Sequence, residues 1–223
     1  MTAAPSTQSK TIRVVIVDDH DVVALGLRAL LEDEDDIEVL DCVHSVAEAA
    51  TAARNLNPDV ILMDYRLPDG TGADATRQVR AAPAPPTVVM VTSAADRRVL
   101  NEALEAGCAG FVSKNADRQD LVSAVRAAAH NDSYFTRDML NHLVHLRRFD
   151  QIDNQELSSR ECDVLQLTAN GLNPDEIASR LYLSPHTVKN HLRHAMSKLD
   201  AHTKLDAVVK AIRARLISID EAG

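Results

Sequence analysis

The chain has 223 residues, 45% of them apolar, and a formal net charge of −9, which suits one large domain or two small ones with a hydrophobic core. Its three cysteines (Cys42, Cys108 and Cys162) are too few and too far apart for a disulfide scaffold or a zinc cluster, and they indicate a reducing, cytoplasmic setting. No apolar run approaches the roughly 18 residues of a membrane span. The start, MTAAPSTQSK, lacks the pattern of a secretion signal.

The charge is unevenly distributed along the chain. Residues 1–153 contain 15 Lys and Arg against 24 Asp and Glu, a net of −9, whereas residues 154–223 contain nine of each. Within residues 186–215, seven basic residues occur with two acidic ones. This distribution predicts two domains with different partners, an acidic one followed by one with a basic pair of helices.

The first half alternates between short apolar runs and helical periodicity. Five runs are expected to form strands: Ile12–Val17, Val39–Val43, Val60–Met63, Val88–Val91 and Gly110–Val112. Each is followed by apolar residues at helical spacing, in Asp21–Leu31, Ala47–Ala53, Ala75–Val79, Val99–Ala106 and Leu121–Ala129. Fully apolar strands joined by helices predict an α/β domain at residues 11–130, a doubly wound, five-stranded parallel sheet of the flavodoxin type.

Chemically active side chains follow four of these strands. Asp18 and Asp19 follow the first, Asp64 the third, Thr92 the fourth and Lys114 the fifth, and ligands of such folds bind beyond these strand ends. Two carboxylates about 4 Å apart repel by about 4 kcal/mol at an effective dielectric constant of about 20, so a hard cation such as Mg²⁺ is expected among them. A carboxylate beside Mg²⁺ can attack an activated phosphoryl group. Any single Asp could instead be a helix-start carboxylate, so the prediction rests on the set.

Four segments that contain these residues resemble the receiver domain of bacterial two-component response regulators: V-D-D-H at 17–20, D-Y-R-L-P-D-G-T-G at 64–72, V-T-S at 91–93 and G-F-V-S-K at 110–114. The resemblance implies that Asp64 is the phosphoacceptor and takes its phosphoryl group from the phosphohistidine of a sensor histidine kinase. It also implies that Asp19, Asp64 and the backbone carbonyl of Arg66 bind Mg²⁺ directly, while Asp18 acts through water.

The same resemblance assigns three further residues to the response to phosphorylation. Thr92 and Phe111 match the hydroxyl and aromatic positions that rearrange, and Lys114 matches the lysine that holds the phosphoryl oxygen. Phe111 stands where the family often has Tyr. No G-x-G-x-x-G follows the first strand and no P-loop motif occurs, so a nucleotide-binding fold is disfavoured.

The rear half, residues 156–218, is expected to be an all-α domain of four capped helices. Capping residues occur at Ser158, Asn173, Ser184 and Thr203, two of them with the spacing of a capping box. Two helices joined by a tight turn, the second of them basic, predict a helix-turn-helix. The polar face of its second helix offers donors to bases or phosphates, although a solvated face without a ligand fits equally well.

Leu157–Leu216 is similar to a LuxR-type helix-turn-helix, with L-S-S-R-E-C-D-V-L, A-N-G-L-N-P-D-E-I-A, L-S-P-H-T-V-K-N-H-L and S-K-L-D. Both halves together resemble the NarL/FixJ family of transcriptional regulators. The resemblance implies DNA contacts by two groups of residues, the base-facing Lys189, Asn190 and Arg193, and Thr187 and Lys204 at phosphates or helix caps. It also implies a dimer face on the last helix, made by Leu205, Val208, Val209 and Ile212; this stripe could alternatively pack on its own domain.

Residues 131–155 form the predicted linker between the halves. Its apolar residues predict a short amphipathic helix, and they are Met139, Leu140, Leu143, Val144 and Leu146. This helix either packs at the edge of the receiver core or couples the two domains.

The patterns and the resemblance together predict a bacterial, cytoplasmic transcription regulator that is not a conventional enzyme. We expect Mg²⁺-dependent phosphorylation of Asp64 and binding to double-stranded promoter DNA as a homodimer, with RNA polymerase as a further candidate partner and no membrane partner. Three alternatives stay open: a regulator that binds DNA without phosphorylation, a Mg²⁺-dependent phosphatase with Asp64 as nucleophile, and a protein-binding module that has lost DNA. The phosphatase would need a second Asp where Arg66 stands.

Overall fold

The computed structural model describes residues 11–93, 97–135, 140 and 157–218. Most of the predicted linker helix, including Met139, Leu143, Val144 and Leu146, lies outside the described residues, whereas Leu140 is buried. Among the described residues, no helix is both long and apolar enough to cross a membrane.

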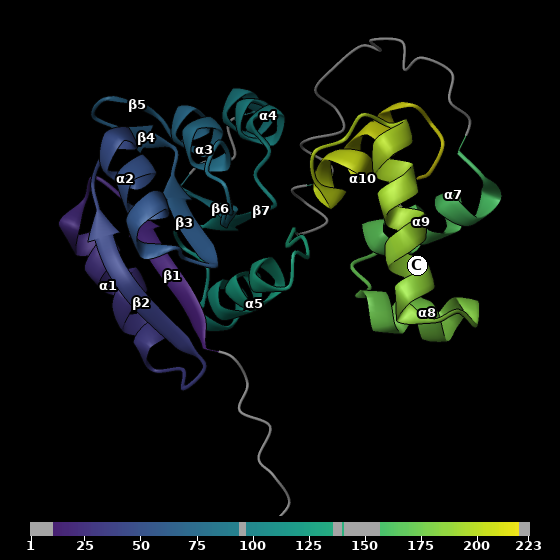
Figure 1. The fold of residues 1–223 in the computed structure, drawn as a ribbon, viewed down its shortest axis with the longest axis horizontal. Helices are drawn as coiled ribbons and strands as arrows, with labels where there is room; N and C mark the ends of the chain where they lie inside the picture. The colour runs from purple at the N-terminus through teal and green to yellow at the C-terminus, as the bar shows by residue number, and fades with distance from the viewer. Residues whose placement is uncertain (1–10, 94–96, 136–139, 141–156, 219–223) are drawn as a thin grey trace, which may run out of the picture.

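The N-terminal domain is a five-stranded parallel sheet in the order β2-β1-β3-β6-β7. Its strands are β1 (Ile12–Val17), β2 (Ile37–Val43), β3 (Val60–Asp64), β6 (Thr87–Thr92) and β7 (Gly110–Ser113). Its helices are α1 (Asp21–Glu32), α2 (Val46–Leu56), α3 (Gly72–Arg80), α4 (Arg97–Ala106) and α5 (Arg118–Ala129). Helices α1 and α5 cover one face of the sheet and α2, α3 and α4 the other (Figure 1). The predicted doubly wound architecture is confirmed.

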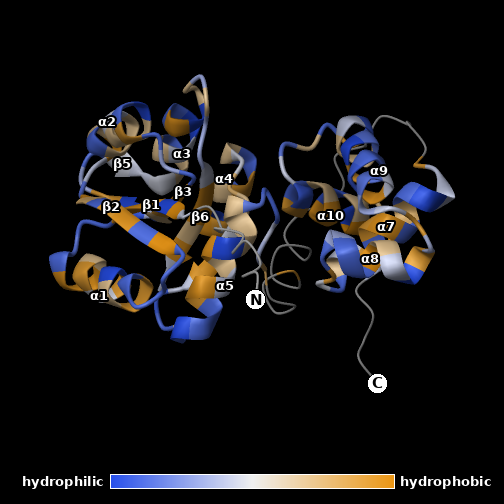
Figure 2. Cartoon of the chain, turned by 60° about the horizontal axis from the view of Figure 1, so that its bottom comes forward, coloured by the Kyte–Doolittle hydropathy of each residue, from blue (hydrophilic) through white to orange (hydrophobic). Residues whose placement is uncertain are grey.

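Both faces of the sheet are apolar, as the continuous hydrophobic runs predicted (Figure 2). Alternate residues of a strand point to opposite faces, so Val15 and Val17 of β1 pack in the core under α2, α3 and α4, whereas Val14 and Ile16 pack in the core under α1 and α5. All four side chains are buried. The burial of both faces explains why these strands carry no polar alternation.

The connection from β3 to α3 contains a short antiparallel pair, β4 (Arg66–Leu67) and β5 (Gly70–Thr71), that the sequence did not predict. Two-residue strands are too short to show a period of two. Helix α3 also begins three residues earlier than expected, because Thr71 caps it: the Thr71 hydroxyl accepts a hydrogen bond from Asp74 N, and the Asp74 carboxylate accepts one from Thr71 N.

The C-terminal domain contains the four predicted helices, α7 (Ser159–Ala169), α8 (Pro174–Leu181), α9 (Pro185–Lys198) and α10 (Lys204–Arg213). Each expected capping residue accepts a hydrogen bond from the first turn of its helix: Ser158, Asn173, Ser184 and Thr203. Tyr182 adopts a left-handed conformation (φ 55°) that ends α8 and opens the tight turn before α9.

Glu161 joins α7 to α9 inside this domain. Its buried carboxylate accepts hydrogen bonds from Ser158 N at 2.7 Å and from Lys198 Nζ at 2.8 Å. Burial opposes ionisation of this carboxyl, but the donors from Lys198 and Ser158 outweigh it and lower the pKa of Glu161 below its ordinary value of 4.5. The capping box of α7 is therefore also a tertiary contact.

Candidate functional site

Three aspartates gather at the carboxyl ends of β1 and β3, which are neighbours in the sheet. One carboxylate oxygen each from Asp18, Asp19 and Asp64, together with a ring nitrogen of His20, lie within 4.8 Å of one another. Asp18 and Asp64 are 1% and 6% exposed, whereas Asp19 faces solvent. The structure thus brings together the carboxylates that the strand-end argument predicted to converge.

Lys114 reaches the same site from the end of β7. Its Nζ lies 2.6 Å from Asp18 Oδ2 and 2.8 Å from Asp64 Oδ2. Burial alone would lower the pKa of Lys114, but its hydrogen bonds and charge interactions with the two carboxylates raise the pKa above its ordinary value. For Asp64 the balance is the opposite, because burial raises the pKa of its carboxyl more than Lys114 lowers it.

Thr92 and Phe111 occupy different surroundings. Thr92 ends β6, is 8% exposed, and its carbonyl accepts a hydrogen bond from Lys114 N at 2.9 Å, which places it between the strands that carry Asp64 and Lys114. Phe111 is fully buried in the core on the α4 side of the sheet. The participation of the Arg66 carbonyl stays a prediction; Arg66 is exposed on β4, two residues after Asp64.

The backbone around Asp64 is tightly held. Tyr65 N donates a hydrogen bond to Asp64 Oδ1 at 2.7 Å, and Gly72 N donates one to Tyr65 O at 2.7 Å. A Cβ atom on Gly72 would lie 2.2 Å from Asp64 O, so only glycine lets α3 start this close to the site. The sequence analysis missed Tyr65, although its position directly after Asp64 was a signal.

The donors at this site fit a hard divalent cation such as Mg²⁺, which prefers carboxylate oxygens. Asp18 Oδ2 is buried and lies 2.6 Å from Lys114 Nζ, the same ammonium that contacts Asp64 Oδ2. His20 is the N-cap residue of α1, and its Nδ1 lies 2.6 Å from Asp19 Oδ1. A cation at this position would add a counter-charge that one lysine does not provide for three carboxylates.

Helix α9 has the predicted apolar and polar faces. Val188, Leu192 and Ala195 are buried, whereas Lys189 and Arg193 are exposed. The partly buried Asn190 accepts a hydrogen bond from Arg193 Nη1 at 3.0 Å. Thr187 lies in the first turn of α9, where its backbone N donates to the Ser184 hydroxyl at 3.1 Å; this contact caps the helix.

The polar face of α9 lies toward the N-terminal domain. A cavity of about 540 Å³ is bordered by residues of both domains, including Arg80, Thr87 and His130 on one side and Lys189 and Arg193 on the other. Lys204, at the start of α10, also lines it.

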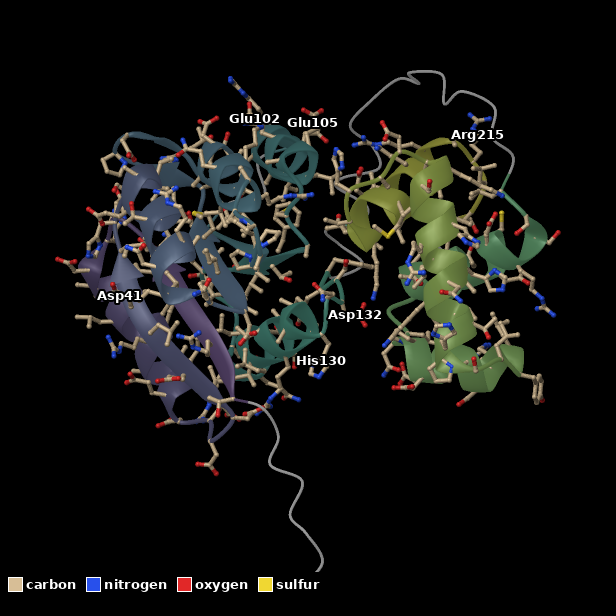
Figure 3. The ribbon with its side chains drawn as sticks, viewed as in Figure 1. Asp41, Glu102, Glu105, His130, Asp132 and Arg215 are labelled. Atoms are coloured by element: carbon tan, nitrogen blue, oxygen red, sulfur yellow. The ribbon has the colours of Figure 1, made fainter. Side chains whose placement is uncertain are left out.

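Helix α10 contacts the N-terminal domain directly. Lys204 Nζ lies 2.9 Å from a carboxylate oxygen of Asp132, which follows α5 (Figure 3), and Leu205 N donates to the Ser133 hydroxyl at 3.2 Å. The predicted dimer stripe is not exposed in this arrangement: Leu205, Val208 and Val209 are fully buried and Ile212 is 9% exposed. In this structure the stripe packs within the helical domain and toward α4, as the alternative interpretation had it, and its role as a dimer face stays a prediction.

Comparison with known proteins agrees with both halves of this geometry. Residues 14–126 match the response regulator receiver domain, and residues 155–211 match the bacterial regulatory proteins of the luxR family. The chain belongs to the two-component response regulators with a LuxR-type DNA-binding domain. The response regulator protein VraR of Staphylococcus aureus is 33% identical over 207 residues, which are 93% of this chain and 99% of that protein.

Solved structures of response regulators cover both domains. The crystal structure of ChrA, from a heme-sensing two-component system, has 32% sequence identity and a TM-score of 0.52, and the match covers 93% of this chain and 99% of ChrA. A structure of two RcsB dimers bound to two parallel DNAs has the same fold, with 23% identity, a TM-score of 0.57, and coverage of 92% of this chain and 99% of RcsB. Both domains of this chain, the receiver and the LuxR-type DNA-binding domain, are thus those of a response regulator.

Proposed function

We propose that this response regulator is switched by phosphorylation of Asp64 from a sensor histidine kinase, in the presence of Mg²⁺, and that it then binds promoter DNA as a homodimer. The observation that carries the proposal is that Asp64, Asp18 and Lys114 converge at the carboxyl edge of the sheet. Asp64 is the last residue of β3, and its side chain is buried except for the 6% of its surface that solvent can reach.

The phosphoryl transfer follows from the positions of these groups. A carboxylate oxygen of Asp64 attacks the phosphorus of a phosphohistidine, a new O–P bond forms, and the P–N bond breaks. The electron pair of that bond returns to the imidazole nitrogen, which takes up a proton. The Lys114 ammonium, 2.8 Å from Asp64 Oδ2, would stabilise the charge on the transferred oxygens, and the Thr92 hydroxyl would donate a hydrogen bond to them.

Asp18, Asp19 and Asp64 would hold the Mg²⁺, with Asp18 acting through water and the Arg66 carbonyl as a further oxygen donor. When bound, Mg²⁺ supplies positive charge that offsets repulsion between the carboxylates and the incoming phosphoryl group. The product stays on Asp64 of the same chain, so the protein is a phosphoacceptor rather than a conventional enzyme. The exposed Arg66, where a phosphatase would need a second acid, supports this assignment.

For DNA binding we propose base contacts from Lys189, Asn190 and Arg193, and phosphate contacts from Thr187 and Lys204. In the described arrangement Lys189 and Arg193 border the cavity shared with the receiver, and Lys204 pairs with Asp132. Phosphorylation would release the helical domain and uncover the α10 stripe for dimerisation. Because residues 154–223 carry equal numbers of basic and acidic residues, a dimer would supply phosphate contacts that one copy lacks.

The regulator would act in the cytoplasm, where the kinase's phosphodonor domain, promoter DNA and RNA polymerase are all accessible. That RcsB binds DNA as dimers supports the dimeric mode proposed here.

The test is a mobility shift on promoter fragments with and without acetyl phosphate and Mg²⁺. We expect acetyl phosphate to raise the affinity of the wild type and not that of Asp64→Asn. Lys189→Ala or Arg193→Ala should lose about 1–3 kcal/mol at a specific site, whereas Arg54→Ala, on α2 of the receiver, should lose nothing. Identical occupancy by wild type and Asp64→Asn would favour a regulator independent of phosphorylation.

A further inference from the structure

Tyr65 contacts both the phosphoacceptor and helix α4. Its backbone N donates to Asp64 Oδ1 at 2.7 Å, and its phenol hydroxyl donates to the Glu102 carboxylate on α4. Arg98, one turn earlier on α4, pairs with Glu102 at 2.7 Å. The Tyr65 side chain, next to the proposed phosphorylation site, therefore links Asp64 to Glu102, which is 37 positions after Tyr65 in the chain.

The Tyr65 hydroxyl is a permanent donor. A phenol is protonated at neutral pH, and the Tyr65 hydroxyl is directed at the Glu102 carboxylate. The hydrogen bond from Tyr65 in turn lowers the pKa of Glu102, which keeps that carboxylate ionised. A donor on a neutral phenol and an ionised acceptor give a charge-assisted hydrogen bond, stronger than a neutral one.

Phosphorylation acts directly on the backbone contact of Tyr65. Both oxygens of Asp64 have donors, since Oδ1 accepts from Tyr65 N and Oδ2 lies 2.8 Å from Lys114 Nζ. Forming an O–P bond at either oxygen converts the carboxylate to a neutral acyl group, which is a weaker acceptor. Gly72 N donates to Tyr65 O, so weakening the Asp64 contact would change one of the two backbone hydrogen bonds that position Tyr65.

Helix α4 carries this contact to the DNA-binding domain. Asn101, next to Glu102, accepts a hydrogen bond from Arg213 Nη2 of α10 at 3.0 Å. Phe111, at the aromatic position expected to rearrange, is fully buried and has no hydroxyl. Among the described residues, Tyr65 thus offers a phenol link between the phosphoacceptor and α4.

We propose that Tyr65 is a positioning residue, whose hydrogen bond to Glu102 transmits phosphorylation of Asp64 to α4 and from there to the Asn101–Arg213 contact with α10. The proposal rests on the proposed function, because it assumes that Asp64 is phosphorylated. In this proposal the Tyr65 hydroxyl couples Asp64 to α4, whereas the Tyr65 ring only packs against the hydrophobic core.

The test compares Tyr65→Phe with Tyr134→Phe in the full-length protein. Tyr134 is a matched control, since its hydroxyl also donates to a carboxylate, Asp120 Oδ1 at 2.6 Å, but on α5. Two quantities are measured for each: the phosphoryl label taken up from acetyl phosphate, and the ratio of DNA affinities with and without phosphorylation.

We expect Tyr65→Phe to take up the wild-type amount of label while its affinity ratio falls about tenfold, within the usual range of coupling between sites. Glu102→Ala should reduce the ratio equally, and the double variant no further, because both changes break the same hydrogen bond between Tyr65 and Glu102. Tyr134→Phe should keep the wild-type ratio.

Three results would overturn the proposal. If Tyr65→Phe is labelled and keeps the full wild-type affinity ratio, the coupling role of Tyr65 is refuted while the proposed function stands. An equal fall of the affinity ratio in Tyr134→Phe would have the same meaning. A wild type that takes up no label removes the proposed function, and this proposal with it. If Tyr65→Phe fails to fold or to take up label, Glu102→Ala decides, because it leaves the Asp64 segment unaltered.

Discussion

Replacing Gly72 by alanine tests how closely α3 must approach Asp64, the proposed phosphoacceptor. The added methyl carbon would lie 2.2 Å from Asp64 O, about 1 Å closer than an ordinary carbon–oxygen contact, and 3.0 Å from the Cα atom of Tyr65. Both neighbours are backbone, so no side-chain rotation relieves the overlap. The start of α3 and the Asp64 segment must therefore separate by about 1 Å.

The size of the effect follows from this overlap. Forced overpacking of a buried site typically costs about 1–3 kcal/mol, and we expect the upper end because backbone must move on both sides. For a receiver of this size, 3 kcal/mol lowers the melting temperature by about 10 °C. A displacement of about 1 Å at reacting groups can slow a reaction by about a hundredfold, so phosphorylation of Asp64 by acetyl phosphate should slow as well.

The assay is thermal and urea unfolding followed by circular dichroism, with Gly26→Ala as the control. Gly26 lies exposed in the middle of α1 with nothing within 4 Å of an added Cβ, so this change should stabilise the protein by about 0.5–1 kcal/mol. Gly72→Ala with wild-type stability and wild-type phosphorylation would refute the inference that backbone contact at Gly72 positions Asp64.

Three further predictions concern other contacts. Lys114→Gln should lose about 3 kcal/mol of unfolding free energy in EDTA, because the two buried carboxylates of Asp18 and Asp64 lose their cation. In urea unfolding, Mg²⁺ should therefore stabilise the variant more than the wild type. An equal effect of Mg²⁺ on both proteins would contradict this. Glu161→Gln should lose about 2 kcal/mol of unfolding free energy at pH 7. Since the folded pKa of Glu161 is lowered, its contribution is fully present above pH 4.5 and is lost as the pH falls through the folded pKa, so the stabilities of the two proteins in urea unfolding should converge on acidification; a difference that does not change with pH would refute this. Asp132→Asn should free Lys204 and raise the DNA affinity of the unphosphorylated protein about two- to fivefold in a mobility shift, whereas unchanged binding would show that this pair does not restrain the helical domain.

Most of the fold was predictable because its signals are local. The apolar runs of the sheet strands have no polar alternation, which indicates burial on both faces, and the capping residues of the rear helices act within three residues of themselves. The convergence of Asp18, Asp64 and Lys114 was predictable for a related reason: in a parallel sheet all carboxyl strand ends lie at one edge.

The contacts that the sequence analysis missed depend on tertiary placement. The hydrogen bond from Tyr65 to Glu102 joins residues 37 positions apart, and no period or motif links them. The burial of Val208 and its neighbours on α10 could not be separated from a dimer face, because an apolar stripe at helical spacing looks the same in both cases. The β4–β5 pair was missed because two residues per strand carry no periodicity.

The claim on which the account depends most is that Asp64 is the residue charged with a phosphoryl group. Intact-protein mass spectrometry after incubation with acetyl phosphate and Mg²⁺ tests it most directly, followed by peptide mapping of the product. The account predicts that the wild type gains one phosphoryl mass, located on the peptide that contains Asp64, and that Asp64→Asn gains none. Equal labelling of the variant, or a label on another residue, would contradict the account.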